Sequence, residues 1–438
     1  MLKAGVAIRD ITPKVRTLTS GYPEEGRSAL MAHDPLYTSA YYFDDGKTRM
    51  LFFCNDVINM TKDRTDEIRM LVEKHTGIPR KNIAVSCTHT HSGPITGGDI
   101  WKDFESLGEL EPENNDRMRD LMLEAAEDAV ANSFDAKIGW GKGYCGKEQG
   151  IGGNRHDPEN GQYDPSVNIL AVKDTSDALR GCIVNYSNHP TVLHAGNYFF
   201  TADFPCYIRE TLNARYPFMV FGFSMGASGN QSTRFFRTGQ NYDEAKRIGS
   251  TIGNEAMKVL DSIEFRTDVV LKSNSVFVTP PLKQFPPYAE AAATLKMVQA
   301  KYDDLVARNA PYKETRAVQS VLEGSVFMEG FTKSLEKADL SVILGRQLPL
   351  ECHALRIGDG VILGVGCEHF VEISQAIKAA SPFAVTMIAS LTNGCTTGYV
   401  CADYAYDQLC YEAQASTFAK GAAQSVIDAC NEAVNSVK

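Results

Sequence analysis

The sequence predicts an α/β fold in which mixed β-sheets are flanked by helices, with an inserted helical lobe near residues 280–350. Short apolar runs typical of strands alternate with amphipathic patterns typical of helices. Some neighbouring runs are joined by tight-turn residues and others by predicted helices, which indicates both hairpins and crossovers. Because hairpins give antiparallel pairs and crossovers give parallel pairs, the sheets are expected to be mixed.

The first predicted elements are a hairpin and a helix. Two apolar runs in residues 36–57 are separated by Asp-Asp-Gly at 44–46, which favours a tight turn. In the segment that follows, Thr61 is a suitable N-cap, and Ile68 and Val72 lie on one helical face. This spacing predicts an amphipathic helix packed on the hairpin.

The alternation continues to the end of the chain. Strands are predicted in residues 82–87, 136–141, 167–174, 181–187, 217–224 and 383–390, with a second hairpin in 350–366. Helices are predicted in residues 115–134 and 243–263, and from about residue 404 onward. After the break PPLKQFPP, an alanine- and charge-rich segment predicts a helical hairpin that breaks near residues 309–311. We interpret it as an inserted lobe, either a lid or an ordinary peripheral helix pair.

Composition and charge exclude several classes of function. A net charge of −10 argues against a nucleic-acid partner, because the phosphates would be repelled. No apolar run approaches about 18 residues, so no transmembrane segment is expected. The N-terminus lacks the pattern of a secretory leader, and the odd number of cysteines contains no CxxC pair. We therefore expect reduced, buried thiols in a cytoplasmic protein, with a mature exported form as the alternative. The sequence does not specify an oligomeric state.

Two histidines stand two residues apart in NIAVSCTHTHSGP, where an apolar run ends. In an extended strand His89 and His91 point to the same side, and the break at Gly93 and Pro94 can hold both toward one cavity. Neutral imidazole is a good zinc ligand. A polar strand end without metal is the alternative for this motif taken alone.

Two further stretches place a polar residue where an apolar strand ends. His189 ends the run GCIVNYSNHP, and Glu368 follows the run VILGVGC at a predicted helix start. Either residue alone often has a structural role, since a carboxylate at a helix N-terminus stabilises the helix dipole. Two histidines and one glutamate also form a known catalytic zinc set. The three stretches together therefore predict convergence on one metal site.

In this order, the motifs resemble those in the catalytic domain of the neutral ceramidases. The resemblance is carried by AGVAIRDITP, HDPLYTSAYYFDDG, THTHSGP, GIGGNRHDPENGQYDPSVNILAV, NHPTVL with the later TADFP, GVGCEHF, and TGYVCADYAYDQLCYEAQAST. Tyr399 and Tyr411 are twelve residues apart, as in the family. The resemblance implies one neutral-ceramidase-like zinc hydrolase domain over residues 1–438. Secreted members carry a further C-terminal β-sandwich domain, and because the matched motifs extend to about residue 418 of 438, we expect no such domain here.

Carried over position by position, the resemblance implies a Zn²⁺ ligand set and a catalytic set around it. The implied metal ligands are His89, His189, Glu368 and Tyr399. The implied catalytic residues are His91, Arg155 and Tyr411. Zinc in such a set activates water. Arg155 and Tyr411 would stabilise an oxyanion, and His91 would relay a proton to the departing amine.

The motifs depart from the family pattern in places. In GASGNQSTR, Asn230 stands where the family has an acidic residue. We expect Asn230 and Ser232 to bind substrate through polar contacts, and we do not expect Ser232 to be a nucleophile. No apolar slot or membrane-approach segment for a two-tailed lipid is identifiable, so the metal chemistry is better supported than a lipid substrate.

The leading prediction is a zinc-dependent hydrolase that cleaves an N-acyl (amide) bond in a small-molecule or lipid-like substrate. One alternative keeps the zinc and takes a small soluble ester, lactone or amide, such as a sugar or amino-acid derivative. A TIM-barrel amidohydrolase also uses HxH, but hairpins interrupt the alternation that a barrel of eight βα units needs. A non-catalytic zinc-stabilised binding protein would need a closed site with four firm ligands.

Overall fold

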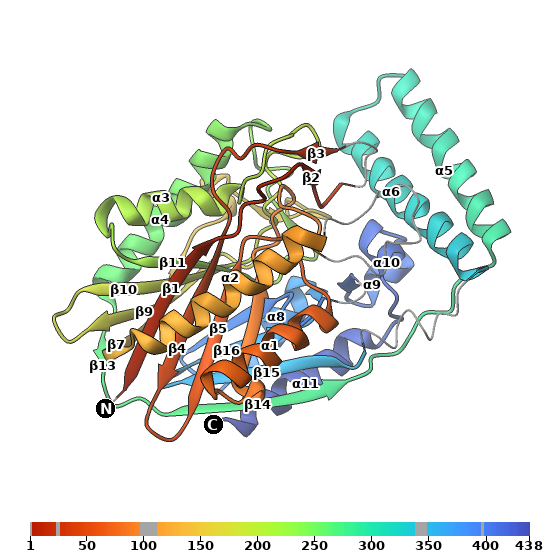
Figure 1. Cartoon of the computed structure of the whole chain (residues 1–438). Helices are drawn as coiled ribbons and strands as arrows, with labels where there is room; N and C mark the ends of the chain where they lie inside the picture. The colour runs from red at the N-terminus through yellow and green to blue at the C-terminus, as the bar shows by residue number, and fades with distance from the viewer. Residues whose placement is uncertain (1, 23–26, 97–111, 338–347, 396–397) are drawn as a thin grey trace.

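The computed structural model describes residues 2–22, 27–96, 112–337, 348–395 and 398–438. These residues form two main β-sheets that pack against each other, with helices on the outer face of each sheet (Figure 1). Both sheets contain antiparallel and parallel strand pairs. The predicted α/β fold with mixed sheets flanked by helices is therefore confirmed.

The larger sheet is formed by strands from the N-terminal part of the chain. In spatial order they are β11 (Val220–Met225), β10 (Leu179–Tyr186), β9 (Ser166–Asp174), β7 (Phe134–Tyr144), β1 (Lys3–Asp10), β4 (Tyr37–Asp44), β5 (Arg49–Asn55) and β6 (Ile83–Cys87), with β13 (Phe265–Arg266) also paired to β7. The sheet bends between β1 and β7, which pair only at Lys3 and Ala4 of β1. Across the bend, the Tyr41 hydroxyl lies 3.0 Å from the Cys182 carbonyl oxygen and 2.9 Å from that of Val220.

The smaller sheet is formed by strands from the C-terminal part of the chain. In spatial order they are β14 (Leu271–Val278), β15 (Leu350–Ile357), β16 (Gly360–Val365) and β18 (Val385–Ser390). Apolar side chains fill the space between the sheets, including Phe52 of the larger sheet and Met387 of the smaller one. Near the functional residues, Asn185 Nδ2 on β10 donates a hydrogen bond of 2.8 Å to the Ile388 carbonyl on β18. This bond fixes the ends of the two sheets relative to each other.

Helices cover the outer faces of both sheets. They are α1 (Lys62–Thr76), α2 (Pro112–Ala131), α3 (Phe204–Arg215) and α4 (Tyr242–Ser262) on the larger sheet, and α8 (Val371–Ala380) and α11 (Ala422–Ser436) on the smaller one. Helix α1 buries Ile68 and Val72, as the spacing predicted, and Thr61 occupies its N-cap position without a side-chain capping hydrogen bond. Burial of such apolar faces, and not intrinsic propensity, supplies most of the stability of helices in a fold of this kind.

Helices α5 (Tyr288–Ala307) and α6 (Tyr312–Leu335) form a hairpin at one end of the molecule (Figure 1). They are separated at residues 309–311, where the sequence predicted the break. Helix α6 also packs against the short helix α10 (Tyr411–Ala415), which follows the smaller sheet in the chain. The interpretation of residues 280–350 as an inserted lobe stays a prediction, and part of it, 338–347, lies outside the described residues.

The C-terminal region differs from the prediction of one long helical stretch from about residue 404. It contains three helices, which are α9 (Tyr404–Asp407), α10 (Tyr411–Ala415) and α11. Leu409 and Gly421 interrupt them with φ values of 49° and 87°. These lie in the left-handed region, which a right-handed helix cannot accommodate. The prediction of one long helical stretch is therefore wrong, because the chain reverses at these two positions.

The cysteines and the apolar helices relate to two predictions made from composition. Each of the eleven cysteines is a free thiol, and all except Cys410 are buried. Within the part of the chain that the structure describes, no helix combines the length and apolar character needed to cross a bilayer. The cytoplasmic location stays a prediction.

Candidate metal centre and active site

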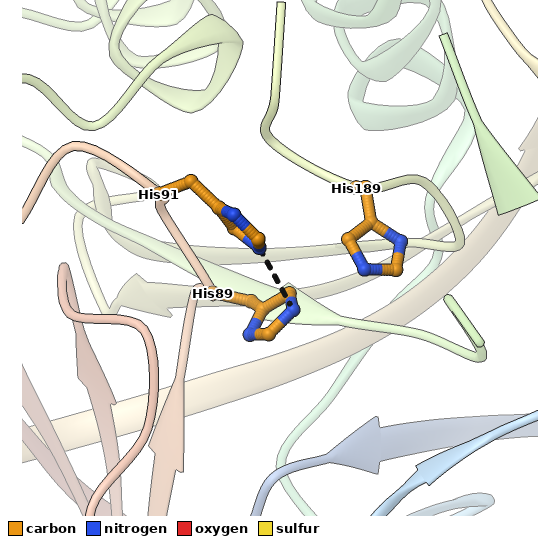
Figure 2. Close-up of side chains that lie close together, drawn as sticks. All are labelled: His89, His91 and His189. Atoms are coloured by element: carbon orange, nitrogen blue, oxygen red, sulfur yellow. Dashed lines mark hydrogen bonds between the residues drawn. The ribbon is translucent and has the colours of Figure 1, made fainter. Parts of the chain in front are cut away.

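His89 and His91 follow β6, and the backbone turns sharply at the first of them. His89 has a φ of 66°, an uncommon left-handed conformation for a residue with a side chain. Its N–H donates to the Val57 carbonyl at 3.0 Å, which holds the turn against the neighbouring strand end. Both imidazoles consequently face one point, with their Nε2 atoms 3.3 Å apart (Figure 2).

His189 reaches the same point from the loop after β10. Its ring centroid lies 4.9 Å from that of His89, and Figure 2 shows the rings of His89, His91 and His189 turned toward one another. One nitrogen from each of the three rings lies within 4.8 Å of the others. The His189 backbone is held by a bridge to Ser232 on the short strand β12 (Gln231–Ser232).

Glu368 joins this group from the smaller sheet. Its Oε2 lies 3.2 Å from His89 Nε2 and 3.0 Å from His189 Nε2. The residue is on the short strand β17 (Glu368–His369), whereas the sequence predicted a helix start at this position. Helix α8 begins three residues later, at Val371, because the chain first pairs with another short strand.

Backbone carbonyls determine which ring nitrogens of two histidines carry hydrogen. His89 Nδ1 lies 2.9 Å from the Ile58 oxygen, and His189 Nδ1 lies 3.0 Å from the Gln231 oxygen. A carbonyl only accepts, so each Nδ1 donates and each neutral ring presents a lone pair at Nε2. Three acceptors therefore face one another, and His189 Nε2 and Glu368 Oε2 are buried without a hydrogen-bond partner among the described residues. Two imidazoles oriented by carbonyls, with one carboxylate, fit a zinc ion.

The protonation states also suit a divalent cation. Burial and the nearby charge of Arg155 lower the pKa of His189 to about 4. Burial, with His89 and His189 nearby, lowers the pKa of His91 well below its usual value. At neutral pH His189 and His91 therefore present unprotonated imidazoles, the form that binds metal.

Without metal, the protein should lose stability as the pH falls from about 6.5 to about 4. In the folded protein the pKa of His189 is about 4, below the ordinary 6.5 of the unfolded chain. Between these values the unfolded state binds more protons, so the free energy of unfolding decreases by about 1.4 kcal/mol per pH unit for this histidine. Chemical denaturation of chelator-treated protein at about pH 7 and about pH 5 measures the slope.

Two variants test the assignment of this slope. His189→Gln should make it shallower, whereas His75→Gln, on an exposed position of α1, should leave it as in the parent. An unaltered slope in His189→Gln would contradict the neutral state of the buried ring.

Tyr399, Arg155 and Tyr411 are grouped beside Glu368. Tyr399 lies on β19 (Tyr399–Val400), directly opposite Glu368 in the parallel pairing with β17. Arg155 Nη2 lies 3.5 Å from the Tyr399 hydroxyl, and the ring of Tyr411 lies 5.8 Å from that of Tyr399. Burial, and then Glu368, raise the pKa of Tyr399 well above 10, so its hydroxyl carries a proton at neutral pH. All residues implied as ligands or catalytic groups therefore lie in one neighbourhood.

Glu412, which the sequence analysis did not single out, is the ion-pair partner of Arg155. Its carboxylate pairs with Arg155 Nη2, and its second oxygen lies 2.8 Å from His156 Nε2. The Arg155 and Glu412 side chains are only 7% and 2% exposed. Although burial would raise the pKa of Glu412, the charge of Arg155 and the hydrogen bond with His156 lower it. The sequence feature that could have identified Glu412 is its position directly after Tyr411, in a motif already assigned to the site.

Ser232 and Asn230 lie near the site, but their side chains are already hydrogen bonded. Ser232 Oγ accepts from the Arg234 N–H at 3.1 Å. Asn230 Oδ1 accepts from the Val371 N–H at 2.9 Å, and its Nδ2 donates to Glu372 at 2.9 Å. Asn230 thus holds the start of α8 close to Glu368. The predicted substrate-binding roles of Ser232 and Asn230 stay predictions.

The comparison with known proteins supports the motif-based resemblance. No family model matches the sequence. A solved structure described as a ceramidase complexed with C2 matches with a TM-score of 0.73 and 16% identity, over 99% of this chain and 74% of that chain. The crystal structure of neutral ceramidase from Pseudomonas aeruginosa matches with a TM-score of 0.72 and 18% identity, over the same shares. The chain has the neutral ceramidase fold. The predicted resemblance is confirmed at this level, and the mixed, hairpin-rich sheets exclude the TIM-barrel alternative.

Proposed function

We propose that this protein is a zinc-dependent hydrolase that cleaves an N-acyl bond. The observation that carries the proposal is the convergence of His89 Nε2, His189 Nε2 and Glu368 Oε2, which fit a divalent cation. The last two atoms are buried without a hydrogen-bond partner among the described residues. The neutral ceramidase fold supports an amide bond as the target.

The residues around the metal centre have separate roles in the proposed reaction. His89, His189 and Glu368 would hold the metal, with Tyr399 beside them as the fourth candidate ligand. A bound zinc ion polarises a carbonyl and lowers the pKa of water. Arg155 directs a guanidinium toward the negative charge that develops on the carbonyl oxygen.

In the proposed reaction His91 would transfer a proton and Tyr411 would donate a hydrogen bond. The low pKa of His91 leaves its ring unprotonated at neutral pH. From its place beside the metal ligands it would accept a proton from the attacking water and pass it to the departing amine. Burial raises the pKa of Tyr411, which keeps its hydroxyl protonated as a hydrogen-bond donor. These roles distinguish the proposal from a zinc-stabilised binding protein, in which His91, Arg155 and Tyr411 would have no chemical task.

Removal of metal should abolish turnover, and zinc should restore it. The assay is fatty-acid release from ceramide and from soluble N-acyl compounds, before and after chelation. His91→Ala should lower kcat by about 10²- to 10⁴-fold, the usual contribution of a general acid–base, while the metal content is unchanged.

His75→Ala is the matched control, because His75 is exposed on α1 and distant from the proton path. It should match the parent in both kcat and metal content. Full activity of the chelated protein, or of His91→Ala, would contradict the proposed mechanism.

A further inference from the structure

A segment after the second histidine motif runs along the metal centre and carries two arginines. The Arg155 N–H donates to the Asn230 carbonyl at 2.9 Å, so the segment begins beside the catalytic arginine. The N–H of Arg234 then donates to Ser232, whose backbone bridges to His189. Three residues further on, Arg237 Nη1 donates to the Thr191 carbonyl at 2.5 Å, close after His189 in the chain.

Helix α6 of the helical hairpin adds a third arginine to the same region. Arg316 is buried, and it forms two hydrogen bonds with Glu323, of 2.9 and 3.1 Å. The rings of Phe235 and Tyr312 lie 6.3 Å apart, which connects the arginine-bearing segment to the start of α6. Arg234, Arg237 and Arg316 are called the arginine cluster below.

The positive charges of this cluster act on one another. Burial, followed by the charges of Arg316 and Arg155, lowers the pKa of Arg234 to about 10. Burial, followed by Arg237 and Arg234, lowers the pKa of the adjacent His194 to about 4. Like charges gathered in a partly buried region are unfavourable unless an opposite charge is present.

Most of the charged groups nearby already have partners. Glu412 pairs with Arg155, and Glu323 pairs with Arg316. Asp203 accepts hydrogen bonds from the backbone N–H groups of Phe204, at the start of α3, and of Leu193. The guanidinium of Arg234, in contrast, makes no hydrogen bond or ion pair with any residue that the structure describes, although it is only partly exposed. Its fork of donors is therefore available to an external anion.

We propose that Arg234, supported by Arg237 and Arg316, forms an oxyanion-binding subsite beside the metal centre, and that the substrate carries a carboxylate close to its N-acyl bond. An N-acyl amino acid has this chemistry, whereas ceramide carries no charge. The reaction rests on the proposed function above, but binding at the subsite can be measured without turnover. A guanidinium recognises the planar carboxylate through two parallel hydrogen bonds.

The test uses ketone isosteres that cannot be hydrolysed. In 4-oxohexadecanoic acid, a CH₂ group replaces the amide N–H of an N-acylglycine, and its primary amide is the uncharged match. Calorimetric titration of the purified full-length protein should give an affinity for the acid at least about tenfold above that for the amide. The corresponding phosphonate distinguishes a carboxylate subsite from one that prefers phosphate-like groups. Tighter binding of the phosphonate than of the acid would overturn the assignment to a carboxylate.

Variants test whether Arg234 is responsible for the preference for the acid over the amide. Arg234→Gln should bring the acid-to-amide affinity ratio close to one with unchanged zinc content, and Arg234→Lys should retain part of the preference. Arg215→Gln is the control, because Arg215 lies on the exposed face of α3 in a surface ion pair with Asp261. In the parent, added salt should weaken binding of the acid and not of the amide. Because the salt dependence is measured on the parent protein, it tests the proposal even if Arg234→Gln does not fold.

Three results would contradict the proposed subsite. The first is an acid-to-amide affinity ratio near one in the parent, and the second is an undiminished affinity ratio in folded Arg234→Gln. The third is no binding of either compound. An affinity ratio near one, together with metal-dependent amide hydrolysis, would contradict the subsite and support the proposed function. An affinity ratio above about ten without metal-dependent hydrolysis would support the subsite and contradict the proposed function.

Discussion

Replacing Glu368 with alanine should remove both the bound metal and the hydrolytic activity. Glu368 supplies the only carboxylate oxygen found between His89 Nε2 and His189 Nε2 among the described residues. Its loss leaves two neutral imidazoles, which bind a divalent cation much more weakly than a set that includes an anion. We expect activity to fall by more than about 10³-fold, beyond the roughly 10- to 100-fold effect of removing an outer-shell partner.

The matched control is Glu372→Ala on the adjacent helix α8. Glu372 accepts hydrogen bonds from Asn230 and Tyr404, and among the described residues it forms no ion pair with His89 or His189. Metal analysis by mass spectrometry should therefore find about one zinc per chain in the parent and in Glu372→Ala, and almost none in Glu368→Ala. If Glu368→Ala kept its metal and its activity, the proposed ligand set would be wrong.

Replacing Glu412 with glutamine should destabilise the fold and reduce activity together. The substitution keeps the size of the side chain but removes the negative charge that pairs with buried Arg155. An unpaired buried charge typically reduces the free energy of unfolding by about 3–5 kcal/mol. Activity should fall by about 10- to 100-fold as well, because the guanidinium loses the partner that orients it beside Tyr399.

Two further variants separate stability from catalysis. Asp261→Asn removes one partner of the exposed Arg215–Asp261 pair and should change the free energy of unfolding by less than about 1 kcal/mol. The double variant Arg155→Met with Glu412→Leu should regain much of the stability, because apolar side chains replace the buried pair, yet remain inactive. A change below about 1 kcal/mol in Glu412→Gln would show that Arg155 is not desolvated.

Local patterns predicted much of the fold. The hairpin of β4 and β5 followed from two apolar runs around an Asp-Asp-Gly turn, and α1 followed from its cap and its apolar face. The order of strands in the larger sheet did not follow from such patterns. Strand β1 lies between β7 and β4, and that pairing depends on contacts between segments far apart in the chain.

The site was predictable where a motif marks it. His89, His91, His189 and Glu368 each stand where an apolar run ends, and the structure brings them together. The groups that set their chemistry are backbone atoms, such as the carbonyl of Gln231, and no side-chain pattern reveals them. The arginine cluster was also not predictable from local sequence patterns, because Arg316 lies on a helix far along the chain from Arg234.

An anomalous difference map at the zinc absorption edge, from crystals grown with zinc, tests the central claim most directly. We predict one strong peak between the two Nε2 atoms and the Glu368 carboxylate, about 2.0–2.2 Å from each ligand atom. A peak elsewhere on the molecule, or no peak at full zinc exposure, would contradict the proposed metal centre.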